Sequence, residues 1–405
     1  MENVNYKKLN RSINIYPIFY GLTADLIFWI AIDTLFLTTV KNLSASQINS
    51  IDAISTIVGI IFQIILVKIV RKIGNLNSVK LGVTLLFVSV LLNTISTNYI
   101  GFLIAELCYV IGFVFKHMDN VILIKNLKYL NRSEEYINYQ TKGSTIYSLI
   151  TLFLSIISGF MFNINPYIPM IICLLVCFIN IILTNFIYEV PISFDESEVI
   201  ESNYTKNNFS KKIILMIILY GLFYAMIGCG QKNSKLFIQF DLQNLLKIDK
   251  VAIYMSAFIF ISRISRLLSN LLFLKIYNRY KEKMLYIFEF GLVLAFISLL
   301  IGHFIGSIYG IYIMALGFFM FLFIRDPFDN FMRKTLFENS SEKVHDKIVN
   351  YINLTRKIFT LIYSTIVASM LIKLNYVYVM SLLLILSISF IVIIYKVYRL
   401  VREKK

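Results

Sequence analysis

Two stretches of the chain carry an aspartate followed by an asparagine where an apolar run ends in basic residues. They are Asp119-Asn120 in KHMDNVILIK and Asp329-Asn330 in RDPFDNFMRK. A carboxylate beside lysine or arginine can form ion pairs that break and re-form when two conformations exchange. The repetition predicts a gate, with direct ligand contact as the alternative. The gate candidates are Lys72, Asp119, Asn120 and Lys142 in the first half, and Arg279, Asp329, Asn330 and Arg356 in the second.

Three other carboxyl groups lie inside apolar runs, where an ionisable side chain is energetically expensive and suggests function. Asp25 is 12 residues into the run Ile13–Thr39, about 18 Å along a helix that rises 1.5 Å per residue. On a continuous helix Asp33 falls within about 80° of Asp25. These two residues and Glu106 are therefore candidates for binding a proton. The alternative is a structural carboxylate that is hydrogen-bonded to a neighbouring helix.

Polar residues also interrupt the apolar runs of the second half. Gln231, Lys232 and Asn233 could line a cavity, or they could mark where the helix leaves the membrane. Arg263 stands inside FIFISRISRLL, and arginine cannot lose its charge by deprotonation. It needs an anionic ligand or a carboxylate, and the available carboxylates are Glu106, Glu289, Asp25 and Asp33. Arg266, one turn later, could reach water by extending its side chain.

The composition indicates what kind of secondary structure contains these residues. Of the 405 residues 58% are hydrophobic and only 15% are charged, with a mean hydropathy of +0.74, so the chain is not an ordinary water-soluble domain. The net charge of +16 is spread in short bursts between apolar runs, which is typical of membrane-protein loops and argues against nucleic acid as a partner. The four cysteines have no metal-binding spacing, no phosphate-binding loop is present, and no cofactor is expected.

Apolar runs of about 20 residues are long enough to cross a bilayer as helices. We predict twelve such spans, with Ser44 or Ser46 capping the second and Asp249 capping the eighth. A single polar interruption separates six spans from six, giving an N-terminal bundle at 1–188, a linker at 189–211 and a C-terminal bundle at 212–405. The predicted spans are Ile13–Thr39, Ser46–Val70, Ser78–Thr97, Tyr99–Ile124, Tyr139–Phe162, Pro166–Tyr188, Lys212–Phe237, Asp249–Leu274, Met284–Ile301, Gly306–Phe331, Ile348–Leu371 and Asn375–Val397.

The two halves share four short patterns in the same order. YGL at Tyr20–Leu22 recurs at Tyr220–Leu222, and LVKIVRK resembles FLKIYNR 207 residues later. The Asp-Asn pair recurs at a spacing of 210, and YINYQTK is followed by YINLTRK at 215. A steadily growing spacing predicts parallel repeats of six helices.

With this layout the chain resembles the major facilitator superfamily over nearly its whole length. In the loop after the second span, VKIVRKIGN keeps Lys72 for the family's arginine and Gly74 for its glycine, while Arg71 stands where the family has aspartate. The equivalent LKIYNRYKE keeps Arg279. The Arg-x-x-Gln-Gly and Gly-Pro patterns of drug–proton exporters are absent. The resemblance implies an all-α polytopic membrane protein of two six-helix bundles related by pseudo-two-fold symmetry.

The resemblance also implies secondary transport of a small molecule by alternating access, with protons as the coupling ion. Export of a lipophilic or cationic compound is favoured, and uptake of a nutrient or peptide is the alternative. A membrane enzyme acting on lipid-linked substrates would need larger outer loops than the chain has, so we expect no enzyme activity. We further expect a monomer embedded in lipid. Enrichment in Ile, Asn and Lys suggests a bacterial plasma membrane.

The positive-inside rule predicts the orientation of the chain. With a cytoplasmic N-terminus, the inner segments hold 27 of the assigned Lys and Arg residues and the outer loops hold 5. Epitope tags at either terminus or within 189–211 should therefore be accessible only from the cytoplasm. Antibody labelling of intact and permeabilised cells measures this, and labelling of any of the three tags on intact cells would contradict the twelve-span topology.

Overall fold

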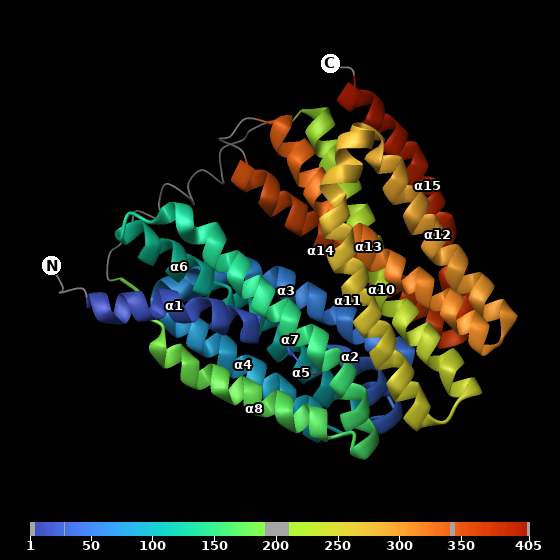
Figure 1. Ribbon diagram of the computed structural model, residues 1–405, viewed down its shortest axis with the longest axis horizontal. Coiled ribbons are helices and arrows are strands. Elements are labelled where there is room, and N and C mark those ends of the chain that lie inside the picture. Colours follow the sequence, from blue (N-terminus) through green and yellow to red (C-terminus); the bar gives the residue numbers. More distant parts are fainter. Residues whose placement is uncertain (1–4, 28, 191–209, 341–344, 403–405) are drawn as a thin grey trace. The chain divides into compact units, whose positions relative to one another are not determined.

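The apolar runs of the sequence are helical, because a helix satisfies its own backbone hydrogen bonds in hydrocarbon. The computed structural model describes residues 5–27, 29–190, 210–340 and 345–402, and these contain no strand (Figure 1). The long helices after the first span are α3 (Ala45–Ile73), α4 (Asn75–Ile95), α5 (Tyr99–Lys116), α6 (Met118–Tyr129), α7 (Tyr136–Ile164), α8 (Ile168–Leu183), α10 (Lys211–Leu245), α11 (Ile248–Tyr280), α12 (Met284–Ile305), α13 (Ile308–Glu338), α14 (His345–Lys373) and α15 (Tyr376–Arg402).

Within the described ranges, eleven segments are long and apolar enough to cross a membrane. They correspond to the second through twelfth predicted spans, with α5 and α6 together forming the fourth. The prediction of a continuous first span was wrong. That run is divided into α1 (Tyr6–Thr23), α2 (Trp29–Leu35) and a π-helical turn, Phe36–Val40. The argument that placed Asp25 and Asp33 on one helical face therefore fails.

Local polar chemistry accounts for the interruption that begins at residue 24. The side chain of Asp25 accepts a hydrogen bond from the N–H of Leu26, 2.8 Å away. Short polar side chains that bond nearby backbone groups compete with helical hydrogen bonds. One turn earlier, the Thr23 hydroxyl donates to the carbonyl of Phe19. The carbonyl of Leu22, at the end of α1, accepts a bond from Asn180 of α8 at 3.0 Å, so tertiary structure replaces part of the lost helical bonding.

The chain divides into two units, and the same helix pairs pack in each. In the first unit α1 packs on α7, and α4 packs on α5 and α8. In the second unit α10 packs on α14, and α12 packs on α13 and α15. Equivalent helices of the two predicted repeats therefore have equivalent neighbours. This is the structural counterpart of the patterns that recur in the sequence.

One segment departs from a division at the linker, because residues 44–53 pack with the second unit. Ser44 caps α3 in a reciprocal arrangement with Gln47, which identifies Ser44 and not Ser46 as the cap. Within the second unit Asn49 donates to Asn233 at 3.0 Å. The predicted cap Asp249 lies instead in the first turn of α11, where a carboxylate still favours the helix N-terminus.

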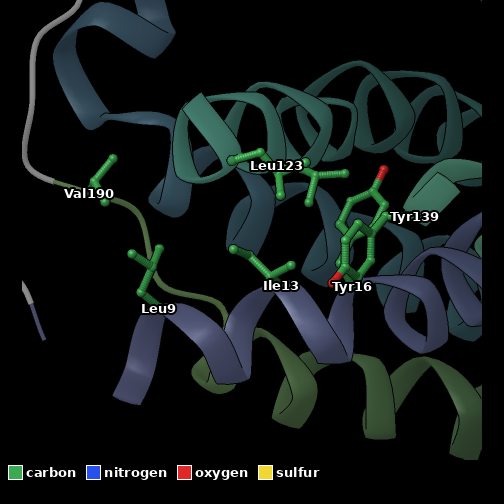
Figure 2. Close-up of a cluster of buried hydrophobic side chains, with 7 residues drawn as sticks. Leu9, Ile13, Tyr16, Leu123, Tyr139 and Val190 are labelled. Atoms are coloured by element: carbon green, nitrogen blue, oxygen red, sulfur yellow. The ribbon is translucent and has the colours of Figure 1, made fainter. Parts of the chain in front are cut away.

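The linker begins with residues that are packed into the first unit. Glu189 accepts hydrogen bonds from the side chain of Asn75 at 2.6 Å and the N–H of Leu76 at 3.2 Å, at the start of α4. Gly74 precedes them with a φ of 81°, which favours glycine. The rest of the predicted linker, 191–209, lies outside the described residues. Figure 2 shows the buried cluster that includes Val190, and its buried members are Leu9, Ile13, Tyr16, Leu123, Leu127, Tyr139 and Val190.

Glycine allows the closest helix contacts in both units. A Cβ on Gly82 of α4 would collide with the backbone of Gly112 and Lys116 in α5. In the second unit a Cβ on Gly302 of α12 would collide with the carbonyl of Gly310 in α13. Small residues let membrane helices approach closely, since packing rather than hydrophobic exclusion drives their association.

This packing predicts that Gly302→Ala lowers stability by about 1–3 kcal/mol, because the backbone of α13 must move. Gly228→Ala is the matched control, since no atom lies within 4 Å of its new methyl group. That change should leave stability unchanged or raise it by up to about 1 kcal/mol through helix propensity. Thermal unfolding of the purified protein in detergent compares the two, and equal melting temperatures would contradict the assigned packing.

Candidate functional site

The break in the first span places a carboxyl group beside a hydroxyl donor from another helix. Tyr109 of α5 donates to Asp25 Oδ1 at 2.9 Å, and Asp25 is half-buried. Glu106 lies one turn before Tyr109 on α5, and its charge interacts with the Tyr109 hydroxyl. The structure therefore brings two of the three predicted proton-binding carboxyls to one tyrosine. Asp33 lies on α2 beyond the break, where it accepts from the N–H of Thr34.

This arrangement has the features of a site for a proton or a small cation. Non-helical backbone at membrane depth is tolerated where it is buried in protein or lines a cavity, and half-helix ends commonly coordinate ions there. Asp25 supplies negative charge at such an end, and Tyr109 positions one of its oxygens. The sequence analysis identified Asp25 and Glu106 but missed Tyr109, since nothing in the sequence links it to residue 25.

The three polar residues of this group lie within α10 and not at its end. Helix α10 continues from Asn233 to Leu245. Gln231 accepts a hydrogen bond from Arg325 at 3.3 Å, and Lys232 forms an ion pair with Asp52. Asn233 is 1% exposed and bonds Asn49. Both Asp52 and Asn49 belong to the segment 44–53 that packs in this unit.

Glu289, one of the four carboxylates that the sequence offers as partners of Arg263, forms no hydrogen bond with it. Glu289 is buried, and neither of its carboxyl oxygens has a hydrogen-bond partner among the described residues. Arg263 is half-buried on α11. Arg266, which the sequence analysis directed toward water, pairs instead with Asp326 of α13 at 2.6 Å. Asn270 donates to the same carboxylate at 3.1 Å.

The two Asp-Asn pairs occupy similar surroundings. In the first unit Tyr16 donates to Asn120 at 2.7 Å, and Lys116 pairs with Asp119 at 3.0 Å. In the second unit a tyrosine and a basic residue form hydrogen bonds with the Asp-Asn pair. There Tyr220 donates to Asp329 at 2.5 Å and Arg333 donates to it at 2.7 Å. The repeated motif therefore occupies a similar local environment in each unit.

The basic residues predicted to pair with these aspartates lie elsewhere. Lys72, Lys142 and Arg279 are not among the observed partners, and Lys72 and Arg279 are exposed. Asn330 is exposed, and Arg356 is half-buried with its guanidinium 5.3 Å from the centre of the Tyr224 ring. The observed partners, Lys116 and Arg333, are three and four residues from their aspartates on the same helix. Side chains three or four residues apart on a helix are neighbours, so both pairs follow from local spacing.

Comparison with known proteins shows the fold. No family model matches the sequence, and no curated protein matches it. The nucleoside transporter NupG is similar at a TM-score of 0.70 and 12% identity, over 98% of this chain and 100% of that one. A bacterial homologue of the iron transporter ferroportin, in an inward-facing state, is similar at a TM-score of 0.67 and 14% identity, over 98% and 100%. The chain has the major facilitator fold.

A third similar structure has the same fold. The bacterial homolog of the human lysosomal transporter Spinster matches at a TM-score of 0.59 and 11% identity, over 99% of this chain and 97% of that one. The major facilitator fold and the eleven long apolar segments of the described ranges make the chain a multi-pass membrane protein. All three similar structures are named as transporters, which agrees with the expectation that the chain is not an enzyme.

The Lys116–Asp119 pair generates a stability prediction. Its two side chains are 2% and 1% exposed, so removing one charge leaves the other buried without its partner. Lys116→Met should therefore destabilise the protein by about 3–5 kcal/mol. The double variant Lys116→Met with Asp119→Leu should recover most of that loss. Thermal unfolding measures both, and a double variant as unstable as the single one would show that lost packing, rather than unpaired charge, sets the cost.

Proposed function

We propose that the chain is a secondary active transporter that carries a small molecule across the membrane by alternating access. The observation that carries the proposal is the major facilitator fold combined with a break in the first span at Asp25. Unlike an enzyme, a carrier needs ionisable groups at membrane depth that change their interactions between states. No phosphate-binding loop occurs in the sequence, so an ion gradient is the proposed source of energy.

Proton coupling through Asp25 is the second part of the proposal. Tyr109 can donate a hydrogen bond to the charged carboxylate of Asp25. The interrupted backbone supplies further polar groups, whose hydrogen bonds can change when the proton binds. By the spacing of the repeats, Ala225 is the equivalent residue in the second half. It is buried within the uninterrupted helix α10. The chemical inequality of the two halves supports a single coupling site, with Asp33 and Glu106 as secondary candidates.

The aspartates of the repeated motif are proposed as gate residues. Asp119 and Asp329 each join a basic side chain and sit beside a tyrosine from the first helix of their own unit. Exchange of these partners between conformations would bias the transport cycle without contact to the cargo. We propose Lys72, Lys142 and Arg279 as the alternative partners in another state.

The proposed cargo and direction of transport rest on the sequence alone. The similar structures are named as carriers of different substrates, among them nucleosides and iron, at 14% identity or less. A bacterial plasma membrane, cytoplasmic termini and a monomeric state complete the proposal, all from the sequence. The sequence favoured export of a lipophilic or cationic compound over uptake of a nutrient or peptide.

The coupling role predicts a selective defect. A cargo is first found by comparing cells with and without the gene for retention of dyes, antibiotics, amphiphilic peptides and nucleosides. In proteoliposomes with an imposed pH gradient, Asp25→Asn should lower accumulation of that cargo at least about tenfold, because the neutral amide cannot exchange a proton. Exchange without a gradient should persist.

Asp249→Asn, which changes an exposed carboxylate in the first turn of α11, is the matched control and should retain accumulation. An Asp25→Asn protein that still concentrates the cargo, and still stops when the proton gradient is collapsed, would remove Asp25 as the proton carrier. Absence of any transported compound from the whole panel would instead count against the transport proposal itself.

A further inference from the structure

One face of α10 opens onto empty space at the middle of the helix. Gly228 is 17 residues from either end of α10. It is exposed although its neighbours on both sides are buried, and no atom lies within 4 Å of the position that a Cβ would take. Tyr224 and Gln231 are four residues before and three residues after it, so they share its face. Polar residues on this face of a membrane helix indicate that it borders a polar space rather than lipid.

Two arginines from neighbouring helices border this space. Arg325 of α13 donates from Nε to the hydroxyl of Tyr224 at 3.0 Å and from Nη1 to Oε1 of Gln231 at 3.3 Å. Its guanidinium is therefore held beside the stretch of α10 that contains Gly228. Arg356 of α14 lies 5.3 Å from the centre of the Tyr224 ring, and Arg325 lies 5.6 Å from it. The two guanidinium carbons are thus at most about 11 Å apart, the sum of these distances.

The carboxylates nearest to these arginines are Asp326 and Asp329, and the charge of Asp326 interacts with Arg325. On α13, Asp326 accepts from Arg266 and Asn270. One turn further, Asp329 accepts from Arg333 and from a tyrosine. Over the described parts of the chain no carboxylate pairs with Arg356, whose charge faces the Tyr224 ring. The guanidinium of Arg356 thus lies near Gly228 without a carboxylate partner among the described residues, in a segment where unbalanced charge is expensive.

We propose that this face of α10 binds an oxyanion, a carboxylate or a phosphate, between Arg325 and Arg356. A guanidinium presents a rigid fork of donors that matches both groups, and arginine stays charged in a membrane. Tyr224 and Gln231 hold the fork of Arg325 in place, and Gly228 leaves room for the ligand to approach the helix.

That the oxyanion belongs to the cargo rests on the proposed transport function, whereas the binding site itself does not. With this site the cargo carries negative charge, in place of the cationic compound that the sequence favoured. The same chemistry would also recognise the phosphate of an anionic lipid headgroup, and the experiment below separates the two sources.

The test measures the local electrostatic potential with a cysteine, and it requires no transport. Gly228→Cys places a thiol in the open space, in a background where the four native cysteines are alanine. The thiol is reacted with anionic methanethiosulfonate ethylsulfonate and with its cationic trimethylammonium analogue. Two nearby positive charges should raise the anionic-to-cationic rate ratio at least about tenfold above that at Leu245→Cys, an exposed control at the end of α10.

Variants of the arginines make the assignment specific. Arg325→Gln and Arg356→Gln should each lower the ratio of the Gly228→Cys protein by about threefold or more, and together they should bring it to the control value. Thermal unfolding confirms that each variant is folded. A ratio equal to the control in the Gly228→Cys protein, or one that neither arginine affects, would overturn the proposal. So would failure of both reagents to react at position 228 while they react at position 245.

Protection experiments identify the ligand chemistry. Inorganic phosphate or succinate should slow modification of the thiol at position 228 at least about threefold in nanodiscs of phosphatidylcholine, while choline should not. Protection that requires phosphatidylglycerol in the nanodisc, and is absent with phosphate and succinate, would assign the oxyanion to lipid. A positive potential with no protection by any of these oxyanions would overturn a binding site. A protein that passes these tests yet moves no compound would retain the site and lose only the transport function.

Discussion

Every structural feature of this chain depends on one constraint, that backbone N–H and C=O groups in hydrocarbon must find partners inside the protein. The long helices meet this constraint with their own backbone hydrogen bonds. The first apolar run is interrupted between α1 and α2, where Asn180 and the Asp25 side chain supply hydrogen bonds that the helix lacks. The irregular backbone there presents polar groups that a continuous helix would use in its own hydrogen bonds. The proposed coupling carboxylate, Asp25, lies at this break.

A second consequence concerns charge. Most ion pairs of the described helices are local or join adjacent helices, such as Lys116 with Asp119 and Arg266 with Asp326. Such pairs compensate charges that would otherwise be costly to bury. Elsewhere charged groups meet neutral ones: Asp25 accepts from the hydroxyl of Tyr109, and Arg356 lies against the ring of Tyr224. The proposed proton site lies in the first unit, and the proposed oxyanion site lies in the second. A carrier that moves a proton together with an anion would use both.

The two units repeat the same helix pairing but differ where chemistry is proposed. Close contacts at glycine recur between α4 and α5 and between α12 and α13, which reflects equal packing demands on equivalent helices. By contrast, α1 is interrupted near Asp25, while α10 runs through Ala225 without a break. Close packing keeps the two halves alike, because a glycine at a helix contact tolerates few substitutions. Polar residues can differ between the halves, since the proposed transport cycle needs only one coupling site and one ligand site.

The sequence by itself determined the fold class, eleven of the twelve spans and the repeated Asp-Asn motif, because apolar length and local spacing are properties of the chain alone. Glycine spacing and the residues three or four positions from Asp119 and Asp329 also lay within reach of the sequence. Only the tertiary structure decided that the first span is broken, that α10 continues past Asn233, and that Tyr109 meets Asp25. It also decided that the Glu289 carboxyl has no hydrogen-bond partner among the described residues and that Arg325 and Arg356 share Tyr224. These features depend on which side chains of distant segments come within a few ångströms, and hydropathy and periodicity carry no information about that.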